Sequence, residues 1–289
     1  MSILADKNTK ILVQGITGVQ ASFHVKRAIA AGTQVVAGVS PHKGGTVYSG
    51  VPVFATVKEA TKNTGATASM MFVPASSVKS AVREAIEAEL DLAVTIAAGV
   101  PIRDMLEIKA MLKGSKTVLI GPNTPGLITP GGANLGIFPE NIYRSGDVGI
   151  VSCSSTLTYE ATLEVGRAGR GQSTVIGLGD DMIVGTDFVE ILKRFHQDDN
   201  TKVIVMLGSL GGMYEEAAAQ YYAGLQHKKP VIAYIAGSKF PLDYKIGYAG
   251  DIITHGKLTA EDKKAIIRKS GMTVVENVNE IHTVLPSLL

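Results

Sequence analysis

Two side chains in one short stretch, residues 243–257, have the chemistry to carry a transferable group: Tyr248 and His255. A phenol has an ordinary pKa of about 10, so Tyr248 is a weak nucleophile at neutral pH unless a neighbour activates it. An imidazole ionises near neutral pH, but His255 lies between Thr254 and Gly256, a setting typical of a solvated loop residue. Each residue therefore stays open between a carrier of a reacting group and a structural part of the loop.

A run of hydroxyl side chains, Ser154-Ser155-Thr156, precedes a helix that the sequence predicts from about Leu157. Hydroxyls at the start of a helix ordinarily cap its first N–H groups. The same N–H groups also favour a bound anion, so the run predicts either a helix cap or an anion site. Cys153, the single cysteine, directly precedes the run; such a thiol can be reactive, although isolated cysteines are mostly structural.

A second anion-binding pattern, Gly15-Ile-Thr-Gly-Val-Gln20, follows a predicted strand and opens a predicted helix. A dinucleotide fingerprint needs a third glycine where this chain has Ala21, and an acidic residue where it has Ser40. Lys43 follows shortly after Ser40, and a lysine suits a phosphate better than a ribose diol. The loop therefore predicts a nucleotide-like phosphate ligand and argues against an NAD-dependent dehydrogenase.

These positions all follow short strands that are almost continuously apolar, which is typical of a parallel sheet covered by helices on both faces. The predicted strands are residues 10–14, 34–39, 68–73, 92–96 and 117–120 in the first half, and 148–152, 173–177, 202–207, 230–235 and 273–276 in the second. Helical stretches alternate with them, so each half predicts a doubly wound α/β sheet. Such sheets bind ligands beyond the carboxyl ends of their strands, where all these loops lie.

The chain's 289 residues fit two domains of ordinary size. A Gly-, Pro- and Asn-rich segment from Pro122 to Gly146 is typical of an inter-domain connection. The sequence therefore predicts a first domain over residues 1–122, a linker over 123–147 and a second domain over 148–289.

Composition narrows the class of protein. A net charge of +2 gives no electrostatic case for nucleic acid or an anionic membrane. The single cysteine excludes an intrachain disulfide and favours a reducing compartment. The start of the chain has no signal-like region, and no apolar run reaches the ~18–20 residues of a spanning helix. We therefore expect a soluble, cytoplasmic protein.

Four loops of the first half resemble the loops that together bind coenzyme A (CoA) in the alpha subunit of succinyl-CoA synthetase. That family has Gly-x-Thr-Gly-Ser-Gln, Gly-Lys-Gly-Gly, Val-Pro-Ala and Gly-Pro-Asn-Cys-Pro-Gly. This chain has Gly15-Ile-Thr-Gly-Val-Gln20, His42-Lys-Gly-Gly45, Val73-Pro-Ala75 and Gly121-Pro-Asn-Thr-Pro-Gly126. The resemblance covers nearly the whole chain and implies an N-terminal Rossmann-like CoA-binding domain and a C-terminal flavodoxin-like domain.

In this resemblance, the first loop and Lys43 hold the CoA phosphates, and the Val-Pro pair packs against its apolar parts. The implied CoA site comprises Gly15, Thr17, Gly18, Val19, Gln20, Lys43, Val73, Pro74, Ile96, Ala97, Ala98 and Asn123. One position departs from the family. Where relatives have Thr-Ile-Thr-Glu-Gly, the chain has Thr95-Ile-Ala-Ala-Gly99, so Ala98 replaces a carboxylate near the thiol end of CoA.

The second half resembles the family's phosphohistidine domain but lacks its reacting groups. Tyr248 stands at the phosphohistidine of Gly-His-Ala-Gly-x-Ile-Ile, Ser209 at the orienting glutamate of Gly-Glu-Ile-Gly-Gly, and Cys153 at a position usually held by arginine. The segment from Gly177 to Met182 adds an aspartate to the family's Gly-Ile-Gly-Gly-Asp-Pro. Each change disfavours phosphoryl transfer, which indicates a diverged paralogue.

The segment Ser-Ser-Thr-Leu-Thr-Tyr-Glu resembles the family's Ser-Gly-Thr-Leu-Thr-Tyr-Glu and implies a substrate or anion site at Ser154, Ser155, Thr156 and Tyr159. No orienting carboxylate is evident near the remaining histidines, so no role is assigned to His24, His42, His196, His227 and His282.

The resemblance implies an alpha-type, CoA-binding subunit of an acid–CoA ligase of the tricarboxylic acid cycle type. Its reaction would convert a carboxylic acid, CoA and a nucleoside triphosphate into acyl-CoA, a nucleoside diphosphate and phosphate. An ATP-grasp beta subunit would supply ATP or GTP with Mg in a heterodimer or heterotetramer. Because Tyr248 and Ser209 replace the family's histidine and glutamate, standard phosphohistidine transfer is not expected. The alternative is a non-catalytic CoA-binding scaffold or regulatory subunit.

Overall fold

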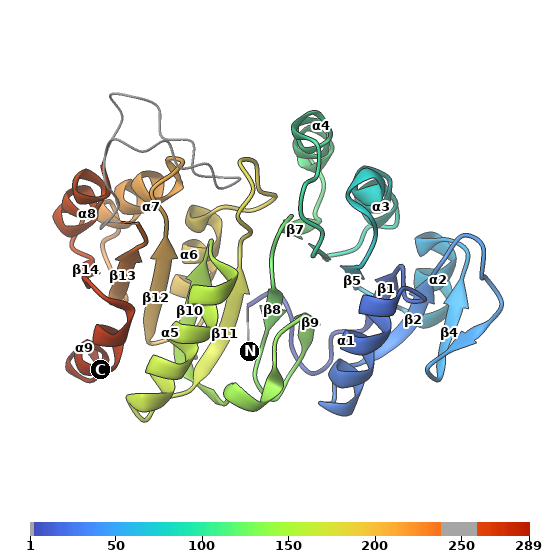
Figure 1. The fold of residues 1–289 in the computed structure, drawn as a ribbon, viewed down its shortest axis with the longest axis horizontal. Coiled ribbons are helices and arrows are strands. Elements are labelled where there is room, and N and C mark those ends of the chain that lie inside the picture. The colour runs from blue at the N-terminus through green and yellow to red at the C-terminus, as the bar shows by residue number, and fades with distance from the viewer. Residues whose placement is uncertain (1–2, 238–258) are drawn as a thin grey trace. The chain divides into compact units, whose positions relative to one another are not determined.

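The computed structural model describes residues 3–237 and 259–289, which form two compact units (Figure 1). The first unit comprises Leu4–Glu140 with Ile183–Thr186. The second comprises residues 3, 141–182, 187–237 and 259–289. Tyr248 and His255 lie outside the described residues.

The first unit is built on a seven-stranded sheet. Its strands are β1 (Ile11–Gln14), β2 (Val35–Val39), β3 (Val47–Tyr48), β4 (Val51–Phe54), β5 (Ala68–Met71), β6 (Leu92–Thr95) and β7 (Val118–Ile120). They run in the order β3-β4-β2-β1-β5-β6-β7, all parallel to their neighbours except β3, which is antiparallel to β4. Every residue of β1, β5 and β6 is buried, as the continuous apolar runs predict.

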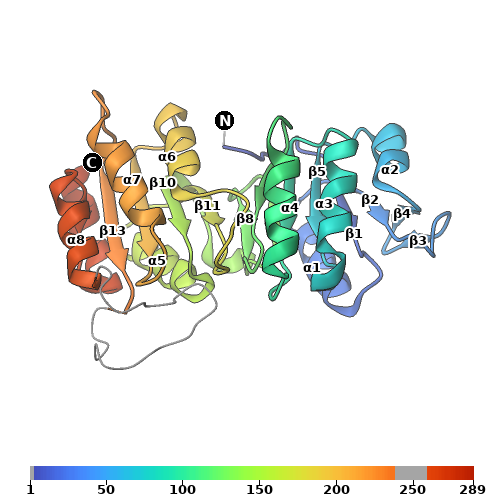
Figure 2. The same ribbon diagram turned by 90° about the horizontal axis from the view of Figure 1, so that it is seen from above.

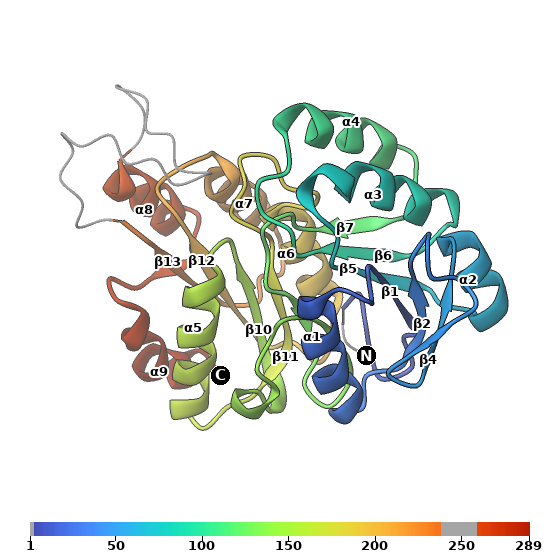
Figure 3. The same cartoon turned by 45° about the vertical axis from the view of Figure 1, so that its right-hand side comes forward.

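Helices cover both faces of this sheet (Figure 3). The helices are α1 (Val19–Ala30), α2 (Val57–Thr64), α3 (Val78–Glu87) and α4 (Ile102–Leu112), and a single 3-10 turn, Ala75–Ser77, precedes α3. The crossovers place α1 on one face and α2, α3 and α4 on the other, because right-handed connections change face when the strand order reverses direction. The core under these three helices includes Val57, Val82 and Ile108, each fully buried.

Two hairpins were not expected from the sequence. The strands β3 and β4 form one at the edge of the first sheet, and β8 (Gly126–Ile128) pairs antiparallel with β9 (Asn134–Gly136). The second hairpin lies in the segment where the Gly- and Pro-rich composition predicted only a connection, and its strands are buried.

The second unit repeats the same architecture (Figure 2). Its strands are β10 (Ser145–Ser152), β11 (Gln172–Gly177), β12 (Val203–Gly208), β13 (Val231–Ile235) and β14 (Thr273–Val274). Its helices are α5 (Ser155–Arg167), α6 (Phe188–Gln197), α7 (Tyr214–Ala223), α8 (Ala260–Lys269) and α9 (Ile281–Val284), with 3-10 turns at Glu140–Ile142, Val278–Glu280 and Leu285–Leu288. The five strands are parallel and run in the order β14-β13-β12-β10-β11.

The helices of the second unit also divide between the two faces of the sheet. The connection through α5 runs opposite to those through α6, α7 and α8, so α5 covers one face and the other three helices cover the other (Figures 1 and 2). The short helix α9 packs against α5.

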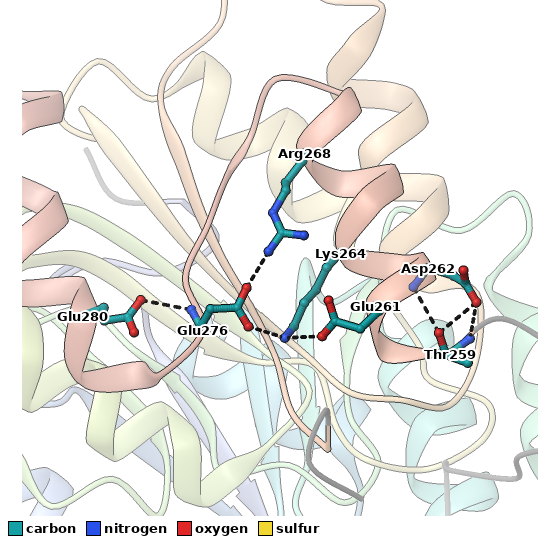
Figure 4. A network of polar contacts seen from close by, with 7 residues as sticks. All are labelled: Thr259, Glu261, Asp262, Lys264, Arg268, Glu276 and Glu280. Carbon is teal, nitrogen blue, oxygen red and sulfur yellow. Dashed lines mark hydrogen bonds and ion pairs between the residues drawn. The ribbon is translucent and has the colours of Figure 1, made fainter. Parts of the chain in front are cut away.

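Helix α8, the first element after residues 238–258, is held by polar contacts in its first two turns (Figure 4). Thr259 forms a capping box with Asp262, whose side chain accepts from the Thr259 N–H at 2.8 Å. On the next turn the fully buried Lys264 pairs with Glu261 at 2.9 Å and Glu276 at 2.6 Å. The start of α8 therefore has a well-defined position in the second unit.

The predicted α/β class, with two mainly parallel sheets, is confirmed, and all ten predicted strands are present with small differences in length. Among the described residues, no helix combines the length and the apolar character needed to cross a membrane.

Candidate functional site

The first candidate site lies at the point where the strand order of the first sheet reverses. β1 has β2 on one side and β5 on the other, so the crossovers from β1 and from β5 leave in opposite directions. Doubly wound sheets bind ligands at this position, beyond the carboxyl ends of the strands. We call the loops that follow β1, β2, β5, β6 and β7 the first edge.

Gly15 allows the loops after β1 and β5 to approach each other closely. Its φ is +79°, a left-handed value, and a Cβ atom there would lie 2.4 Å from the carbonyl oxygen of Phe72. The Gly18 N–H then donates to the Gly15 carbonyl at 3.0 Å, which closes the turn into α1. Only glycine meets both requirements at position 15, so the loop's backbone is set by sequence.

The turn leaves the start of α1 open to a ligand. Gly18 is the N-cap, no side chain caps the helix, and its first turn contains no acidic residue. Gly18, Val19 and Gln20 are exposed, with Val19 at 87%, whereas Thr17 is half-buried. Uncapped N–H groups at a helix start, without a competing carboxylate, favour an anionic ligand.

The loop after β2 exposes the side chain of Lys43 to solvent, while hydrogen bonds hold the backbone of this residue in place. The Lys43 N–H donates to the Ser40 carbonyl at 3.1 Å, and the Lys43 carbonyl accepts from the Thr46 hydroxyl at 2.7 Å. The side chain itself is exposed. The loop therefore presents one cation from the same edge as the start of α1.

The remaining predicted CoA residues lie on the loops after β5, β6 and β7. Pro74 is exposed and Val73 half-buried at the start of the turn that leads to α3. The Asn123 N–H donates to the Ala97 carbonyl at 2.8 Å, which joins the last two loops. Ile96 and Ala97 are half-buried and Ala98 is exposed. The first edge thus brings all twelve predicted CoA residues onto one set of neighbouring loops.

His24, which the sequence gave no reason to single out, lies beside this edge. Its ring stacks on Phe72 with 5.8 Å between centroids and packs edge-on against Phe23 at 5.0 Å. Burial, with a smaller contribution from Arg27, holds the pKa of His24 below its usual value. His24 is therefore a neutral packing residue behind the loop after β5.

The second unit has a corresponding edge, which we call the second edge. β10 lies between β11 and β12, so the strand order reverses there, and the Cys153 N–H donates to the Leu207 carbonyl at 3.0 Å beyond their carboxyl ends. This brings the hydroxyl run after β10 next to the loop Ser209–Gly212, which follows β12.

Ser154 is the N-cap of α5. Its hydroxyl accepts from the Leu157 N–H at 3.4 Å, and its carbonyl accepts from the Thr158 hydroxyl at 2.6 Å. The Ser154 N–H in turn donates to the Ser152 hydroxyl at 3.0 Å. The capping interpretation of this serine is therefore confirmed, and Ser155 and Thr156 lie in the first turn of the helix.

Tyr159 and Cys153 are half-buried on either side of this cap. Burial raises the pKa of the Tyr159 hydroxyl, so this side chain is a neutral phenol that can donate or accept a hydrogen bond. This part of the second edge consequently presents hydroxyl groups from Ser154, Thr156 and Tyr159.

A buried ion pair lies beneath the loop Ser209–Gly212 and was not foreseen. Lys263 of α8 and Glu215 of α7 are 2.9 Å apart, with side chains 1% and 3% exposed. Lys263 also donates to the Ser209 carbonyl at 3.1 Å and the Gly211 carbonyl at 2.8 Å. The charged residues at the start of α8 did not indicate that Lys263 is buried, because its partner, Glu215, lies 48 residues away in the sequence.

One expectation about the histidines is wrong. His282 of α9 does have a carboxylate partner: its Nδ1 lies 2.6 Å from Oε2 of Glu164, a fully buried residue of α5 that also binds Arg167. The pair joins two elements that are 118 residues apart, which is why no local pattern revealed it.

Comparison with known proteins assigns a family to this arrangement. Residues 6–99 match the CoA binding domain family and residues 151–281 match the CoA-ligase family. The alpha subunit of ADP-forming succinate–CoA ligase from Staphylococcus aureus is 46% identical over 285 residues, covering 99% of this chain and 94% of that relative. The chain belongs to the succinate–CoA ligase alpha subunit family.

Solved structures agree with this family assignment. ATP citrate lyase of Methanosaeta concilii in complex with (3S)-citryl-CoA superposes with a TM-score of 0.88 at 25% identity over 99% of this chain. The chain spans about half the length of that protein, 50%. A dinucleotide-forming acetyl-CoA synthetase of Ca. Korarchaeum cryptofilum, at 19% identity and a TM-score of 0.73, shows the same fold.

A member of the succinate–CoA ligase alpha subunit family is a CoA-binding subunit of an acid–CoA ligase, and the two matched families, CoA binding and CoA-ligase, cover the two units in that order.

Proposed function

We propose that the first edge binds CoA through Gly15, Thr17, Gly18, Val19, Gln20 and Lys43, with Val73, Pro74, Ile96, Ala97, Ala98 and Asn123 completing the site. The observation that carries this proposal is the glycine-shaped loop at the switch point of the first sheet, which opens an uncapped helix without a first-turn acid. These features fit a ligand with several phosphate groups.

Within this site, the roles follow from the chemistry of each group. The N–H groups at the start of α1 and the exposed ammonium of Lys43 would bind phosphate oxygens. Val73 and Pro74 would pack against apolar parts of CoA. The methyl group of Ala98 cannot accept a proton, so any activation of the CoA thiol would have to come from another group.

The test is the affinity of the chain for CoA and for dephospho-CoA, measured by calorimetry. Lys43→Ala should weaken CoA binding, by roughly tenfold for one charge-assisted contact, and should make it less dependent on salt. Lys62→Ala, at an exposed position on α2, is the matched control and should leave binding unchanged. Native CoA affinity in Lys43→Ala would remove this lysine from the site, and no CoA binding by the native chain would refute the proposal.

For the whole chain, we propose the role of an alpha-type subunit that pairs with an ATP-grasp beta subunit. The partner would bind ATP or GTP with Mg, and the acid would be held near Ser154, Ser155, Thr156 and Tyr159. Because Tyr248 and Ser209 stand at the family's histidine and glutamate positions, the standard phosphohistidine route would not operate in this chain. We also propose that the protein is cytoplasmic, because its single cysteine favours a reducing compartment.

A second candidate is a non-catalytic CoA-binding scaffold or regulatory subunit, favoured by the loss of these two groups. Intact mass spectrometry of the chain with Mg-ATP, CoA and a beta subunit, under conditions that preserve acid-labile phosphate, separates the two. A phosphoryl adduct would support a ligase with a carrier, to be mapped to Tyr248 or His255. CoA binding without any adduct would support the scaffold, or a ligase whose partner moves the phosphoryl group.

A further inference from the structure

The loop Ser209–Gly212 has its backbone held from below by two side chains. The three N–H donors of the Lys263 ammonium go to the Ser209 carbonyl, the Gly211 carbonyl and the Glu215 carboxylate, at 3.1, 2.8 and 2.9 Å. The other oxygen of Glu215 accepts from the Ser209 N–H at 2.9 Å. Both backbone polar groups of Ser209 are therefore engaged by one buried pair, and the ammonium's donors are fully used.

The neighbouring strand end is shaped to admit this pair. A Cβ atom at Gly208 would lie 2.5 Å from the Glu215 Cγ and 2.6 Å from its Oε1. A side chain at that position would displace the carboxylate from its contact with the Ser209 N–H. The end of β12, the loop and the pair thus form one interlocked unit.

The pair also controls charge at this edge. Helix α7 has Glu215 and Glu216 in its first turn, and both side-chain oxygens of Glu216 are buried without a hydrogen bond from residues 3–237 or 259–289. Lys263 lies 3.7 Å from Glu216 as well as 2.9 Å from Glu215, so one ammonium faces two carboxylates. Removing it takes away the cation that lies beside both carboxylates, which makes this edge less favourable to an anionic ligand. Burial already raises the pKa of Glu215, against the opposing effect of Lys263.

We propose that Lys263 and Glu215 are positioning residues of the second edge: together they set the backbone of the loop Ser209–Gly212, and Lys263 offsets part of the carboxylate charge at the start of α7, so that the edge can accept an anion. The proposal rests on the assignment of this edge to the acid or phosphate of the ligase reaction. It goes beyond that assignment because it places the control of the loop in α8, the helix that directly follows residues 238–258.

The same helix offers a matched control (Figure 4). Lys264 is fully buried and bridges Glu261 and Glu276, as Lys263 bridges Glu215 and Glu216. Within the described part of the chain, the Lys264 ammonium contacts those two carboxylates and not the loop after β12. A Lys264→Met variant therefore disturbs α8 by a comparable substitution while leaving the loop contacts in place.

The test is a titration of the isotope-labelled full chain with inorganic phosphate, following the amide signals of residues 209–212 by NMR. In the native chain these amides should shift and saturate. Lys263→Met should weaken the affinity at these amides by roughly tenfold or more, because it removes the carbonyl contacts and leaves the carboxylates unneutralised. Lys264→Met should keep the native affinity.

The double variant E215Q/K263M separates geometry from charge. It lacks both members of the pair, so the summed charge of positions 215, 216 and 263 equals that of the native cluster, and position 215 no longer carries a buried carboxylate without its partner. Weaker phosphate binding in the folded double variant would assign the effect to the loop's geometry; recovery of native affinity would assign it to charge neutralisation alone and overturn the positioning role.

Two further outcomes would overturn the proposal. One is an equal loss of affinity in Lys264→Met, which would reveal a general effect of destabilising α8. The other is the absence of any phosphate-dependent shift at residues 209–212 of the native chain. Neither outcome touches CoA binding at the first edge, which is measured separately, so failure here is distinguishable from failure of the proposed CoA site.

Discussion

The first and second edges occupy the same place in their sheets but are built differently. The first edge is shaped by backbone: Gly15 has a left-handed φ and touches the Phe72 carbonyl, and the loop after β2 is closed by main-chain hydrogen bonds. The second edge is shaped by side chains: a Ser154 cap and the Lys263–Glu215 pair beneath the loop after β12.

This difference explains how the two edges can diverge separately. A site made of N–H groups changes little when surface side chains change, provided that its glycines remain. A site whose reacting groups are side chains loses its chemistry by a few substitutions, while the supporting pair and the sheet remain. The replacements that we propose at Tyr248 and Ser209 would be changes of this second kind.

The largest expected effect is at the support of the second edge. Lys263→Met leaves a buried carboxylate without its partner and should reduce the free energy of unfolding by about 3–5 kcal/mol. Hydrogen exchange of the slowest amides in β12 and β13 measures this locally. The double variant E215Q/K263M, which removes both charges, should recover most of the loss. A loss below 1 kcal/mol in Lys263→Met would show that the pair does not support this unit.

In the first edge, a substitution that adds a single methyl group should cause a loss of stability of comparable size. Gly15→Ala introduces a Cβ atom 2.4 Å from the Phe72 carbonyl at a φ of +79°, and should cost about 2–4 kcal/mol and abolish CoA binding. Gly32→Ala is the control, because its φ is +92° but no atom lies within 4 Å of the added Cβ. It should cost only about 1–2 kcal/mol. Equal losses of unfolding free energy in the two variants would mean that the close approach to Phe72 contributes nothing to the effect of Gly15→Ala.

The sequence predicted the elements that have a local signal. The five strands that we predicted in each half follow from apolar runs such as residues 34–39 and 202–207, and the ligand edges follow from the parallel arrangement that such runs imply. The Gly15 loop was recognisable from local features alone: the spacing of Gly15 and Gly18, and an alanine, Ala21, where a dinucleotide fingerprint has its third glycine. A helix cap was one of two alternatives that the sequence left open for the hydroxyl run, and in the structure Ser154 is the cap.

The parts that the sequence did not reveal depend on distant partners. Lys263 and Glu215 are 48 residues apart, and His282 and Glu164 are 118 apart, so neither pair leaves a periodic pattern. The β8–β9 hairpin was missed because its three-residue strands lie among glycines and prolines, which ordinarily indicate a loop. Its burial, which decides its structure, is a property of the fold.

A smaller change tests whether the Ser154 hydroxyl serves as a cap or as part of a ligand site. Ser154→Ala should cost about 0.5–1 kcal/mol, because the hydroxyl's contact with the Leu157 N–H is long at 3.4 Å. Ser155→Ala, inside the first turn, should cost less. Thermal unfolding compares the two variants. If Ser154→Ala is as stable as the native chain, the capping contact contributes nothing, and a role in ligand binding would have to explain this serine.

The smallest expected effect is a change in the stability of the first unit with pH, which is compared with that of the second unit. Burial lowers the folded-state pKa of His24 from 6.5, so the unfolded chain binds more protons near that pH. The stabilisation is therefore present above about pH 6.5 and is lost as the pH falls through the lowered value. Arg27 adds to the shift and Glu140 opposes it, and partial solvent exposure keeps the effect small.

Hydrogen exchange of β1 and β5 amides between pH 7.5 and 5.5, corrected for intrinsic rates, measures this loss in the first unit. His24→Phe keeps an aromatic ring against Phe72 but cannot be protonated, so it should remove the His24 contribution. Amides of β12 serve as the control. Their unit contains its own half-buried histidine, His196, whose pKa is also lowered by burial, so they should respond to pH alike in the native chain and in His24→Phe. A first unit that gains stability on acidification would contradict the assignment of His24 as a neutral residue packed against Phe72 behind the first edge.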